Sequence, residues 1–581
     1  MCAINGFTFN NSLLLKKMMS YCENRGPDFN DFYNDENISI GHNRLSILDI
    51  NKRSNQPYIF KNLILSFNGE IYNFKELRHI LEKKGYKFET NSDTEVLIKL
   101  FYEYETEAFK KLSGIFSISI WDKSKNILYL IRDIVGVKPL YYKIRNGKFF
   151  FSSLIKPLLI NENKELNLNA ANYYNNFGYN DLRETFFKNI FKVLPGELII
   201  FKNDHIKKEK FLKFNFFKDI SNKLFREKIE NIVKKQSISD VPISLSLSGG
   251  VDSNIILSSI DKKITTYTVS FKYKDNKSLD SQYALQRANE YNTDHNELYI
   301  DEDDFMNSLE HISDIIEEPI ANENMVGNYF LSKKIKEKVI LVGDGGDEIF
   351  SGYNKYRSIY LLSIFNRLNF LKFLKPFVKN KNLQRFFFNN PKELHLSFSN
   401  QNIMDNRKIY KKYKEINYND IIYNHFADQK YKLCLSDIML ADIDTWIQND
   451  VLIRNDKIYM NEGIEVRVPF LDQEMIETFL YYDEFKKINI FNKTKPLLRK
   501  LFKNKIDNVL SIKKGFVSPF QLWINNKKNL DRIKFFFSKE YYFSDLLDYE
   551  SIKLLLTNAS KHHFQIFSLL MFQIFLKRNN F

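Results

Sequence analysis

The first third of the chain alternates apolar and polar residues in short runs that turn residues separate. Between residue 37 and about residue 155, this pattern predicts strands over residues 38–50, 63–74, 115–122, 127–136 and 148–154. Apolar positions three and four apart predict helices over residues 74–86 and 92–104. A further strand pair begins at residue 191 and closes the unit near residue 210. Strands and helices mixed in this order predict a layered α+β domain of the αββα type.

The pattern changes after Pro195 and Gly196. Residues 223–238 form an amphipathic helical pattern, and a continuous apolar strand pattern, a glycine-rich turn and a second helix follow over residues 241–260. Such a strand is typical of a parallel α/β sheet, which is buried on both faces. A chain of 581 residues exceeds what one core usually supports. We therefore expect one domain over residues 2–210 and a second over residues 220–581.

Residues 358–440 are rich in Phe, Leu and Tyr at helical spacing. This stripe predicts a helical subdomain over the second domain, with a basic aromatic helix lying on a membrane surface as the second interpretation. No run of about 18 apolar residues occurs, and the chain does not start with a basic segment followed by an apolar one. We therefore expect neither a membrane span nor secretion.

The composition is that of a globular protein, with 44% hydrophobic and 27% charged residues. The net charge of +15 would suit a nucleic-acid partner, but the lysines are scattered and form no block, so none is predicted. The three cysteines, Cys2, Cys22 and Cys434, lack the spacing of a zinc site or a disulfide framework. This usage predicts a reducing, cytoplasmic setting.

Cys2 carries the first candidate chemistry. Met1 is normally removed before a small side chain, so the mature chain is expected to begin with a thiol and an α-amine on one residue. A thiol of pKa about 8.5 is a weak nucleophile until a base takes its proton, and an α-amine of pKa about 7.7–8.0 is suited to do so. Cys2 is therefore either a catalytic nucleophile or an accident of composition.

Several short motifs give Cys2 a context. They are MCAINGF at residues 1–7, RGPD at 25–28, NRLS at 43–46, NGEIYN at 68–73, SDTE at 92–95 and residues 132–141. Over about the first 200 residues these motifs resemble class II glutamine amidotransferases, which are glutaminases with an N-terminal nucleophile and the αββα Ntn-hydrolase fold. The resemblance implies that Cys2 attacks the side-chain amide of glutamine.

The same resemblance assigns the remaining glutaminase residues. The side-chain amide of Asn68 and the backbone N–H of Gly69 would stabilise the tetrahedral oxyanion. Arg44 would bind the α-carboxylate of glutamine, and Glu70 and Asp93 would bind its α-ammonium. Taken singly, the motifs have structural interpretations: NGE is a common hairpin turn, and Asp93 suits a helix N-cap.

A second candidate site lies in SGGVDS at residues 248–253. Two glycines before a helix N-terminus suit a phosphate, but no lysine follows them, so this is not the Walker pattern. The segment resembles the pyrophosphate-binding loop of enzymes that split ATP into AMP and pyrophosphate. The alternative is an ordinary serine-glycine turn. The resemblance implies ATP contacts from Ser246, Leu247, Ser248, Gly249, Gly250, Asp252 and Ser253, with Asp252 also holding Mg²⁺.

Residues 338–353, KVILVGDGGDEIFSGY, resemble the corresponding segment of asparagine synthetases. This implies that Asp347 is the second magnesium ligand and that Asp344 lies beside the acyl-adenylate. Val342 and Gly343 would contact ATP, and TYTVSF at residues 266–271 looks like the strand whose Val269 meets adenine.

Further segments extend the resemblance. EEPIA at residues 317–321, EGIEVRVPFLD at 462–472 and KPLLRK at 495–500 match the same family, so that it covers nearly the whole chain in the same motif order. Lys495 would stabilise charge on the phosphates and on the tetrahedral intermediate, or else is a solvated helix charge.

The resemblance implies a PP-loop synthetase domain behind the glutaminase. Glutamine, aspartate and ATP with Mg²⁺ would give asparagine, glutamate, AMP and pyrophosphate through β-aspartyl-AMP, with ammonia crossing between the domains. Family members are often dimers, so a homodimer is expected.

The acceptor remains open at this stage. The LDS segment at residues 279–281 and the segment from Arg454 to Lys457 depart from the family pattern. These departures favour, as an alternative, another carboxylate such as a sugar uronate or a peptide. A non-catalytic binding protein and a tRNA-modifying enzyme are further alternatives, but the intact Cys2 and Asp252 motifs and the missing RNA-binding segment argue against them.

Overall fold

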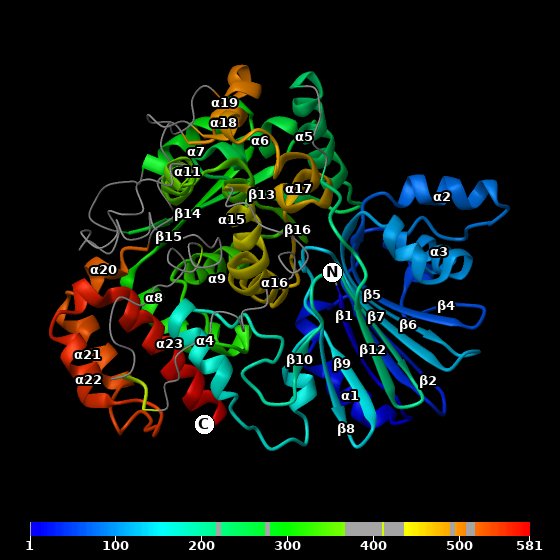
Figure 1. The fold of residues 1–581 in the computed structure, drawn as a ribbon, viewed down its shortest axis with the longest axis horizontal. Coiled ribbons are helices and arrows are strands. Elements are labelled where there is room, and N and C mark those ends of the chain that lie inside the picture. The colour runs from blue at the N-terminus through cyan, green and yellow to red at the C-terminus, as the bar shows by residue number, and fades with distance from the viewer. Residues whose placement is uncertain are drawn as a thin grey trace.

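The computed structural model describes residues 2–216, 222–272, 279–366, 395, 409–411, 435–488, 494–506 and 518–581. Figure 1 shows antiparallel sheets in the N-terminal part of the chain and a parallel sheet surrounded by helices in the rest. Both predicted fold classes are therefore confirmed. Most of the helical region expected over residues 358–440 lies outside the described residues.

The described N-terminal part contains two packed antiparallel sheets. The first runs in the order β10 (Phe191–Lys192), β8 (Tyr141–Arg145), β9 (Lys148–Ser152), β1 (Ala3–Phe7), β3 (Ser39–Arg44) and β2 (Phe29–Asn34). The second runs in the order β12 (His205–Lys210), β11 (Glu197–Lys202), β7 (Ile127–Arg132), β6 (Gly114–Asp122), β5 (Leu63–Ile71) and β4 (Tyr58–Phe60). Their facing side chains, such as Ile4, Ile64 and Leu130, are buried together.

Helices cover the outer faces of both sheets. α1 (Ser12–Ser20) packs on β1 and β3 through the buried side chains of Leu15, Met18 and Met19. A Cβ on Gly41 of β3 would lie 2.5 Å from the sulfur of Met19, so the glycine makes this close approach feasible. On the other side, α2 (Phe74–Lys83) packs against α3 (Asp93–Tyr104), which lies on β5. The result is the predicted αββα layering, to which α4 (Leu168–Phe177) is added.

The second domain is built on a parallel sheet. Its order is β15 (Asp294–Ile300), β14 (Thr265–Phe271), β13 (Ile243–Ser246), β16 (Val339–Leu341) and β17 (Glu465–Arg467), and all its described pairings are parallel. The chain leaves β13 toward β14 on one side and later returns through β16 on the other. Ligands of such sheets bind at the carboxyl ends of the strands where the order switches. The loop after β13 is SGGVDS.

Helices surround this sheet and extend it. They are α5 (Asn222–Gln236), α6 (Val251–Ser259), α7 (Leu279–Glu290), α8 (Glu302–Ile316), α9 (Asn324–Lys334), α10 (Gly346–Phe350), α11 (Asn354–Asn366), α15 (Leu435–Asp442), α16 (Ile453–Met460), α17 (Gln473–Phe479), α18 (Glu484–Lys487), α19 (Pro496–Leu501), α20 (Phe520–Trp523), α21 (Lys527–Phe536), α22 (Tyr549–Leu556) and α23 (His563–Asn579). Within the described ranges, no helix is both long and apolar enough to span a bilayer.

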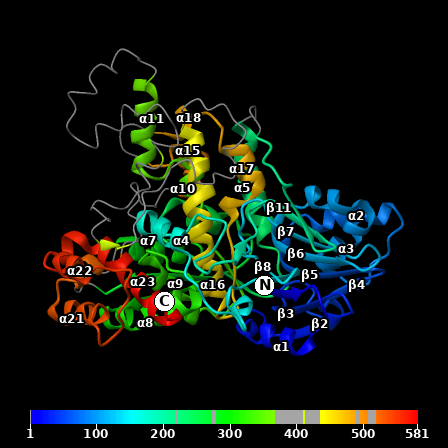
Figure 2. The same cartoon turned by 60° about the horizontal axis from the view of Figure 1, so that its bottom comes forward.

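Buried charges join the two domains. The guanidinium of Arg467 on β17 contacts Glu465 through Nε at 2.5 Å and Glu70 on β5 through Nη2 at 3.2 Å. Arg25 forms a two-pronged pair with Asp456 on α16, at 2.6 and 3.2 Å. Figures 1 and 2 both show α16 in the centre of the molecule, beside the N-terminal domain. These buried ion pairs therefore fix the position of one domain relative to the other.

We predict that Arg467→Met lowers the free energy of unfolding by about 3–5 kcal/mol, because it leaves two buried carboxylates without their partner. The matched control is Lys338→Met, which removes a partly exposed interdomain pair with Asp28 and should cost at most about 1 kcal/mol. Urea unfolding of the full chain measures both. Equal losses would contradict the interface described here.

Candidate active sites

Cys2 lies just before β1, between the two sheets. It is buried, with 7% of its surface exposed. Its backbone nitrogen donates a hydrogen bond to Oδ1 of Asn68 at 3.1 Å, and its carbonyl oxygen accepts one from Nε of Arg25 at 3.4 Å. The structure therefore brings together Cys2 and Asn68, which are 66 residues apart in sequence.

Asn68 and its neighbours lie inside β5, not in a hairpin turn, so the turn interpretation is wrong. The side-chain nitrogen of Asn68 donates to Oγ of Ser117 at 3.4 Å. Its oxygen, not its nitrogen, therefore meets the backbone of Cys2. Gly69 adopts φ 147°, and a Cβ there would lie 2.0 Å from the carbonyl oxygen of Ile115, which requires glycine at this position.

The guanidinium of Arg44 is held by the loop over residues 48–55. Nη1 donates to the carbonyl of Asn51 at 3.0 Å and to Oδ1 of Asn55 at 2.6 Å, and Nη2 donates to the carbonyl of Asp49 at 2.6 Å. Nη2 also donates to the carbonyl of Leu48 at 3.3 Å, so all four terminal N–H groups of Arg44 are occupied at the carboxyl end of β3. A carboxylate could bind Arg44 only through Nε or by displacing one of these bonds.

Asp93 is the first residue of α3, whose N-cap is Ser92, so the interpretation of Asp93 as the cap is wrong. Its Oδ2 instead accepts a hydrogen bond from the backbone of Ile71 on β5 at 2.9 Å. Burial and the nearby Glu465 raise the pKa of Asp93 to about 6. Burial, followed by repulsion from Glu465, likewise raises the pKa of Glu70.

Burial also raises the pKa of the Cys2 thiol, and the positive N-terminus and Arg44 oppose this only in part. The thiol is therefore the resting form near neutral pH. A nucleophilic role needs a base that takes its proton, as the sequence suggested for the α-amine.

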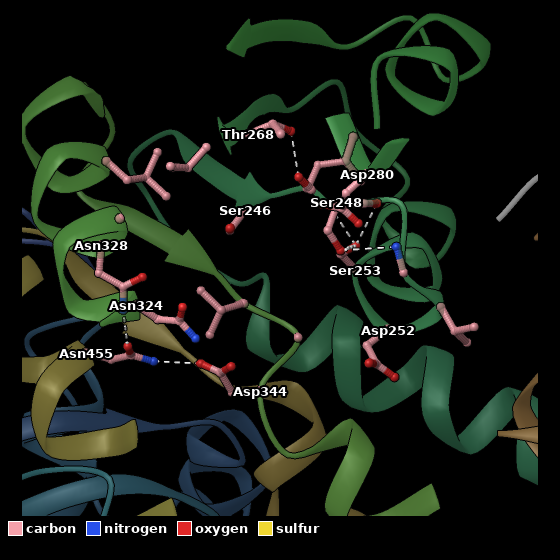
Figure 3. A pocket seen from close by; sticks show the side chains of 18 of the residues that line it. Ser246, Ser248, Asp252, Ser253, Thr268, Asp280, Asn324, Asn328, Asp344 and Asn455 are labelled. Atoms are coloured by element: carbon pink, nitrogen blue, oxygen red, sulfur yellow. Dashed lines mark hydrogen bonds between the residues drawn. The ribbon is translucent and has the colours of Figure 1, made fainter. Parts of the chain in front are cut away.

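The second site is a cavity of about 260 Å³ at the carboxyl ends of β13, β14 and β16. Most of the residues that the sequence assigned to ATP line it. They are Ser246, Leu247, Ser248, Gly250, Asp252, Ser253, Val269, Val342 and Gly343, together with Asp344 and Lys495. Gly249 and Asp347 are not among its lining residues. Figure 3 shows Ser248, Ser253 and Asp280 on one side of the cavity and Asn455 and Asp344 on the other.

The SGGVDS loop is held by its own side chains. Oγ of Ser253 accepts a hydrogen bond from the backbone nitrogen of Ser248 at 3.1 Å, and Oγ of Ser248 accepts one from that of Gly250 at 3.2 Å. The backbone nitrogen of Gly249 donates to Oδ1 of Asp280 at 3.0 Å. A phosphate that used this last N–H would have to displace a carboxylate of the unusual LDS segment.

Lys495 joins the two predicted magnesium ligands. Its Nζ pairs with Oδ2 of Asp252 and lies 2.6 Å from Oδ1 of Asp347. With 2% of its surface exposed, Lys495 is not a solvated helix charge, and burial lowers the pKa of its ammonium although Asp252 opposes the shift.

The carboxylates around Lys495 fit a magnesium ion. Oδ1 of Asp252 is buried and accepts no hydrogen bond from a described residue. A Cβ on Gly346 would lie 2.4 Å from this oxygen, so the glycine leaves it open. Mg²⁺ prefers oxygen ligands and usually takes only one or two protein carboxylates beside substrate phosphates. No group of three or more acidic, His or Cys side chains suited to a metal occurs in the described part of the chain.

The far end of the cavity contains residues that the sequence interpretation did not assign to the site. Nδ2 of Asn328 donates to Oδ1 of Asn455 at 2.7 Å, and Nδ2 of Asn455 donates to Oδ2 of Asp344 at 2.6 Å (Figure 3). Asn324 lies at the same end (Figure 3). Arg454 also lines the cavity, and Asp450, to which it is bonded, lies near Asp344. The departure from the family pattern at Arg454 was the one sequence signal that pointed to these residues.

Comparisons with known proteins match both parts of the chain to known families. Residues 1–212 match a family model described as a glutamine amidotransferase domain, and residues 224–577 match one described as asparagine synthase. Glutamine-hydrolyzing asparagine synthetase 1 of Bacillus subtilis (strain 168) is 32% identical over 89% of this chain and 85% of its own length. Glutamine-hydrolyzing asparagine synthetase 3 of the same organism is 26% identical over 89% of this chain and 86% of its own length. This chain therefore belongs to the asparagine synthase family, as a ligase with an N-terminal glutamine amidotransferase domain.

Proposed function

We propose that the protein makes asparagine from aspartate, glutamine and ATP, with glutamine hydrolysis in residues 2–210 and aspartate activation in residues 220–581. The observation that carries this proposal is that one chain buries Cys2 against Asn68 and also lines a cavity at the switch point of a parallel sheet. A free Cys2 thiol suits the reducing, cytoplasmic setting expected from the sequence.

In the first half-reaction, the α-amine of processed Cys2 takes the thiol proton, and the sulfur attacks the carbonyl carbon of the glutamine side-chain amide. Gly69 supplies a backbone N–H to the oxyanion, and Asn68 supplies its amide nitrogen once that group turns from Ser117. The α-ammonium of Cys2 returns the proton to the leaving nitrogen, which departs as neutral ammonia, and water then hydrolyses the thioester to glutamate and the free thiol. Arg44, Glu70 and Asp93 hold the zwitterionic end of glutamine.

In the second half-reaction, the β-carboxylate of aspartate attacks the α-phosphorus of ATP, and pyrophosphate leaves. Ammonia then attacks the carbonyl of the β-aspartyl-AMP, and AMP leaves. Asp252 and Asp347 would hold Mg²⁺, which supplies positive charge to the phosphates when bound. Lys495 keeps the two carboxylates together and supplies a compact positive charge beside the cavity.

A second candidate function is the same chemistry on another carboxylate. Three asparagine side chains, Asn324, Asn328 and Asn455, line the far end of the cavity. Amides suit the hydroxyl groups of a sugar uronate as well as they suit an amino acid. Release of pyrophosphate with aspartate or with a uronate as the sole acceptor separates the two functions.

We predict that Cys2→Ala lowers glutamine-driven asparagine synthesis to below about one thousandth, because the nucleophile is lost. Synthesis from ammonium, ATP and aspartate should persist. Cys22→Ala, which removes the other described buried cysteine, is the control and should keep glutamine use. Product analysis by chromatography decides, and glutamine-driven synthesis by the Cys2 variant would refute the nucleophile.

We predict that glutamine binding weakens as the pH falls through about 6, because Asp93 must be ionised to hold the α-ammonium of glutamine. Below that pH each unit should cost up to about tenfold in affinity. Calorimetry on Cys2→Ala between about pH 5 and pH 8 isolates binding from chemistry. Adding Asp93→Asn should remove the step near pH 6, and an unchanged step would exclude Asp93 as its source.

We predict that Asp252→Asn and Asp347→Asn each reduce aspartate-dependent pyrophosphate release roughly 100-fold, because each removes a carboxylate that would hold Mg²⁺. Glutamine hydrolysis should continue in both. Asp261→Asn changes an exposed carboxylate paired with Lys234 and serves as the control. Full activity of either site variant at limiting Mg²⁺ would rule out its carboxylate as a metal ligand.

A further inference from the structure

Arg454 is held at the far end of the cavity by one edge of its guanidinium. It is 6% exposed and lines the cavity from α16. Its Nε donates to Oδ1 of Asp450 at 3.1 Å, and Oδ2 of Asp450 accepts a hydrogen bond from Asn322 at 2.7 Å. Asp450 is itself buried. Asp450, itself held by Asn322, therefore fixes the position of the guanidinium.

The other edge of Arg454 is unused. Its two terminal nitrogens form no hydrogen bond or ion pair with any residue in the described part of the chain. We call these two terminal nitrogens, Nη1 and Nη2, the open fork of Arg454. Burying such a fork costs free energy unless an anion binds it, and its geometry matches the two oxygens of a carboxylate. The cavity therefore presents a preoriented site for an anionic group.

This anion is not the triphosphate. The SGGVDS loop and Lys495 belong to the Asp252 end of the cavity. Arg499, the other arginine that lines the cavity, also lies near Asp252: burial lowers the pKa of Arg499, and Asp252 opposes this shift. Arg454 is bonded to Asp450, whose pKa is raised by burial and by the nearby Asp344. Figure 3 shows Asp344 across the cavity from Ser248. The open fork therefore faces the part of the cavity left for the acceptor.

We propose that Arg454 is the specificity-determining residue of the acceptor subsite and binds a second carboxylate, distinct from the one that is activated. This inference rests on the proposed function and deepens it. The acceptor class is then a small amino dicarboxylate, whose α-carboxylate meets Arg454 and whose ammonium meets Asp344. A uronate has a single carboxylate, which is the group that is activated, so it has no second carboxylate to bind Arg454.

The test compares two acceptors that differ only at the α-carboxyl group, aspartate and its α-amide, isoasparagine. Pyrophosphate release by the full-length wild type should favour aspartate by roughly 100-fold or more in kcat/KM, because the uncharged amide leaves the fork unpaired. Arg454→Gln should lose about that factor for aspartate and almost none for isoasparagine. Arg454→Lys, which keeps the charge without the fork, should recover part of the preference.

Two controls separate this role from a structural one. The KM for ATP and the rate of glutamine hydrolysis should not change in Arg454→Gln, whereas Arg499→Gln should raise the KM for ATP and keep the preference for aspartate. Equal losses for both acceptors in Arg454→Gln would overturn the inference alone. A wild type that uses a uronate and neither amino acid would overturn the proposed function as well, so the two failures are distinguishable.

Discussion

The buried guanidinium of Arg467 is the constraint on which the arrangement of the two domains depends. A charge that leaves water costs several kcal/mol unless partners meet it, so Glu465 and Glu70 must stay where they are. The backbone oxygen of Arg467 also accepts a hydrogen bond from Val342 at 3.0 Å. Val342 lines the cavity proposed to bind ATP, and Glu70 follows Gly69 on β5. One residue thus connects the strand proposed to bind glutamine to the wall proposed to bind ATP.

Helix α16 also connects the two proposed sites. Its successive residues can contact different parts of the molecule, because neighbouring side chains point about 100° apart around a helix. Asn455 faces Asp344 in the cavity, whereas Asp456 meets Arg25, which donates to the carbonyl of Cys2. Lys457 points elsewhere again, to Glu317 at 2.8 Å. A π-helical segment, Ile443–Leu452, leads into α16 and contains Asp450. Such segments re-aim side chains, and they recur at functional sites.

The sequence predicted most strands and helices correctly, because their signals are local. Alternation over residues 63–74 corresponds to β5, and the SGGVDS turn corresponds to the start of α6. Strand β1 was missed because all five of its residues are buried. Its sequence therefore lacks the alternation of apolar and polar residues that marks a strand with one exposed face. The N-cap was misplaced by one residue, because Ser92 and Asp93 both suit a cap and only the contact with Ile71 decides between them.

In the candidate sites, too, the sequence indicated the local features, and only the structure showed the contacts between distant segments. Motif spacing located Cys2, Asp252 and their loops, because each motif is a continuous segment. It could not show that Lys495 joins Asp252 to Asp347, since this contact spans 243 residues. Nor could it reveal the open fork of Arg454, which depends on Asp450 one helical turn away and on the shape of the cavity.

The charge of the cavity proposed to bind ATP limits how a polyanion can bind there. Its described lining contains three acids, Asp252, Asp280 and Asp344, and three bases, Arg454, Lys495 and Arg499, so it has no net positive charge. Lys495 is already neutralised by two carboxylates, and an acceptor carboxylate at Arg454 would use a second base. What remains is too little to balance a triphosphate at close range. ATP must therefore bring its own cation, and the buried, unpartnered oxygen of Asp252 is a place where that cation can bind.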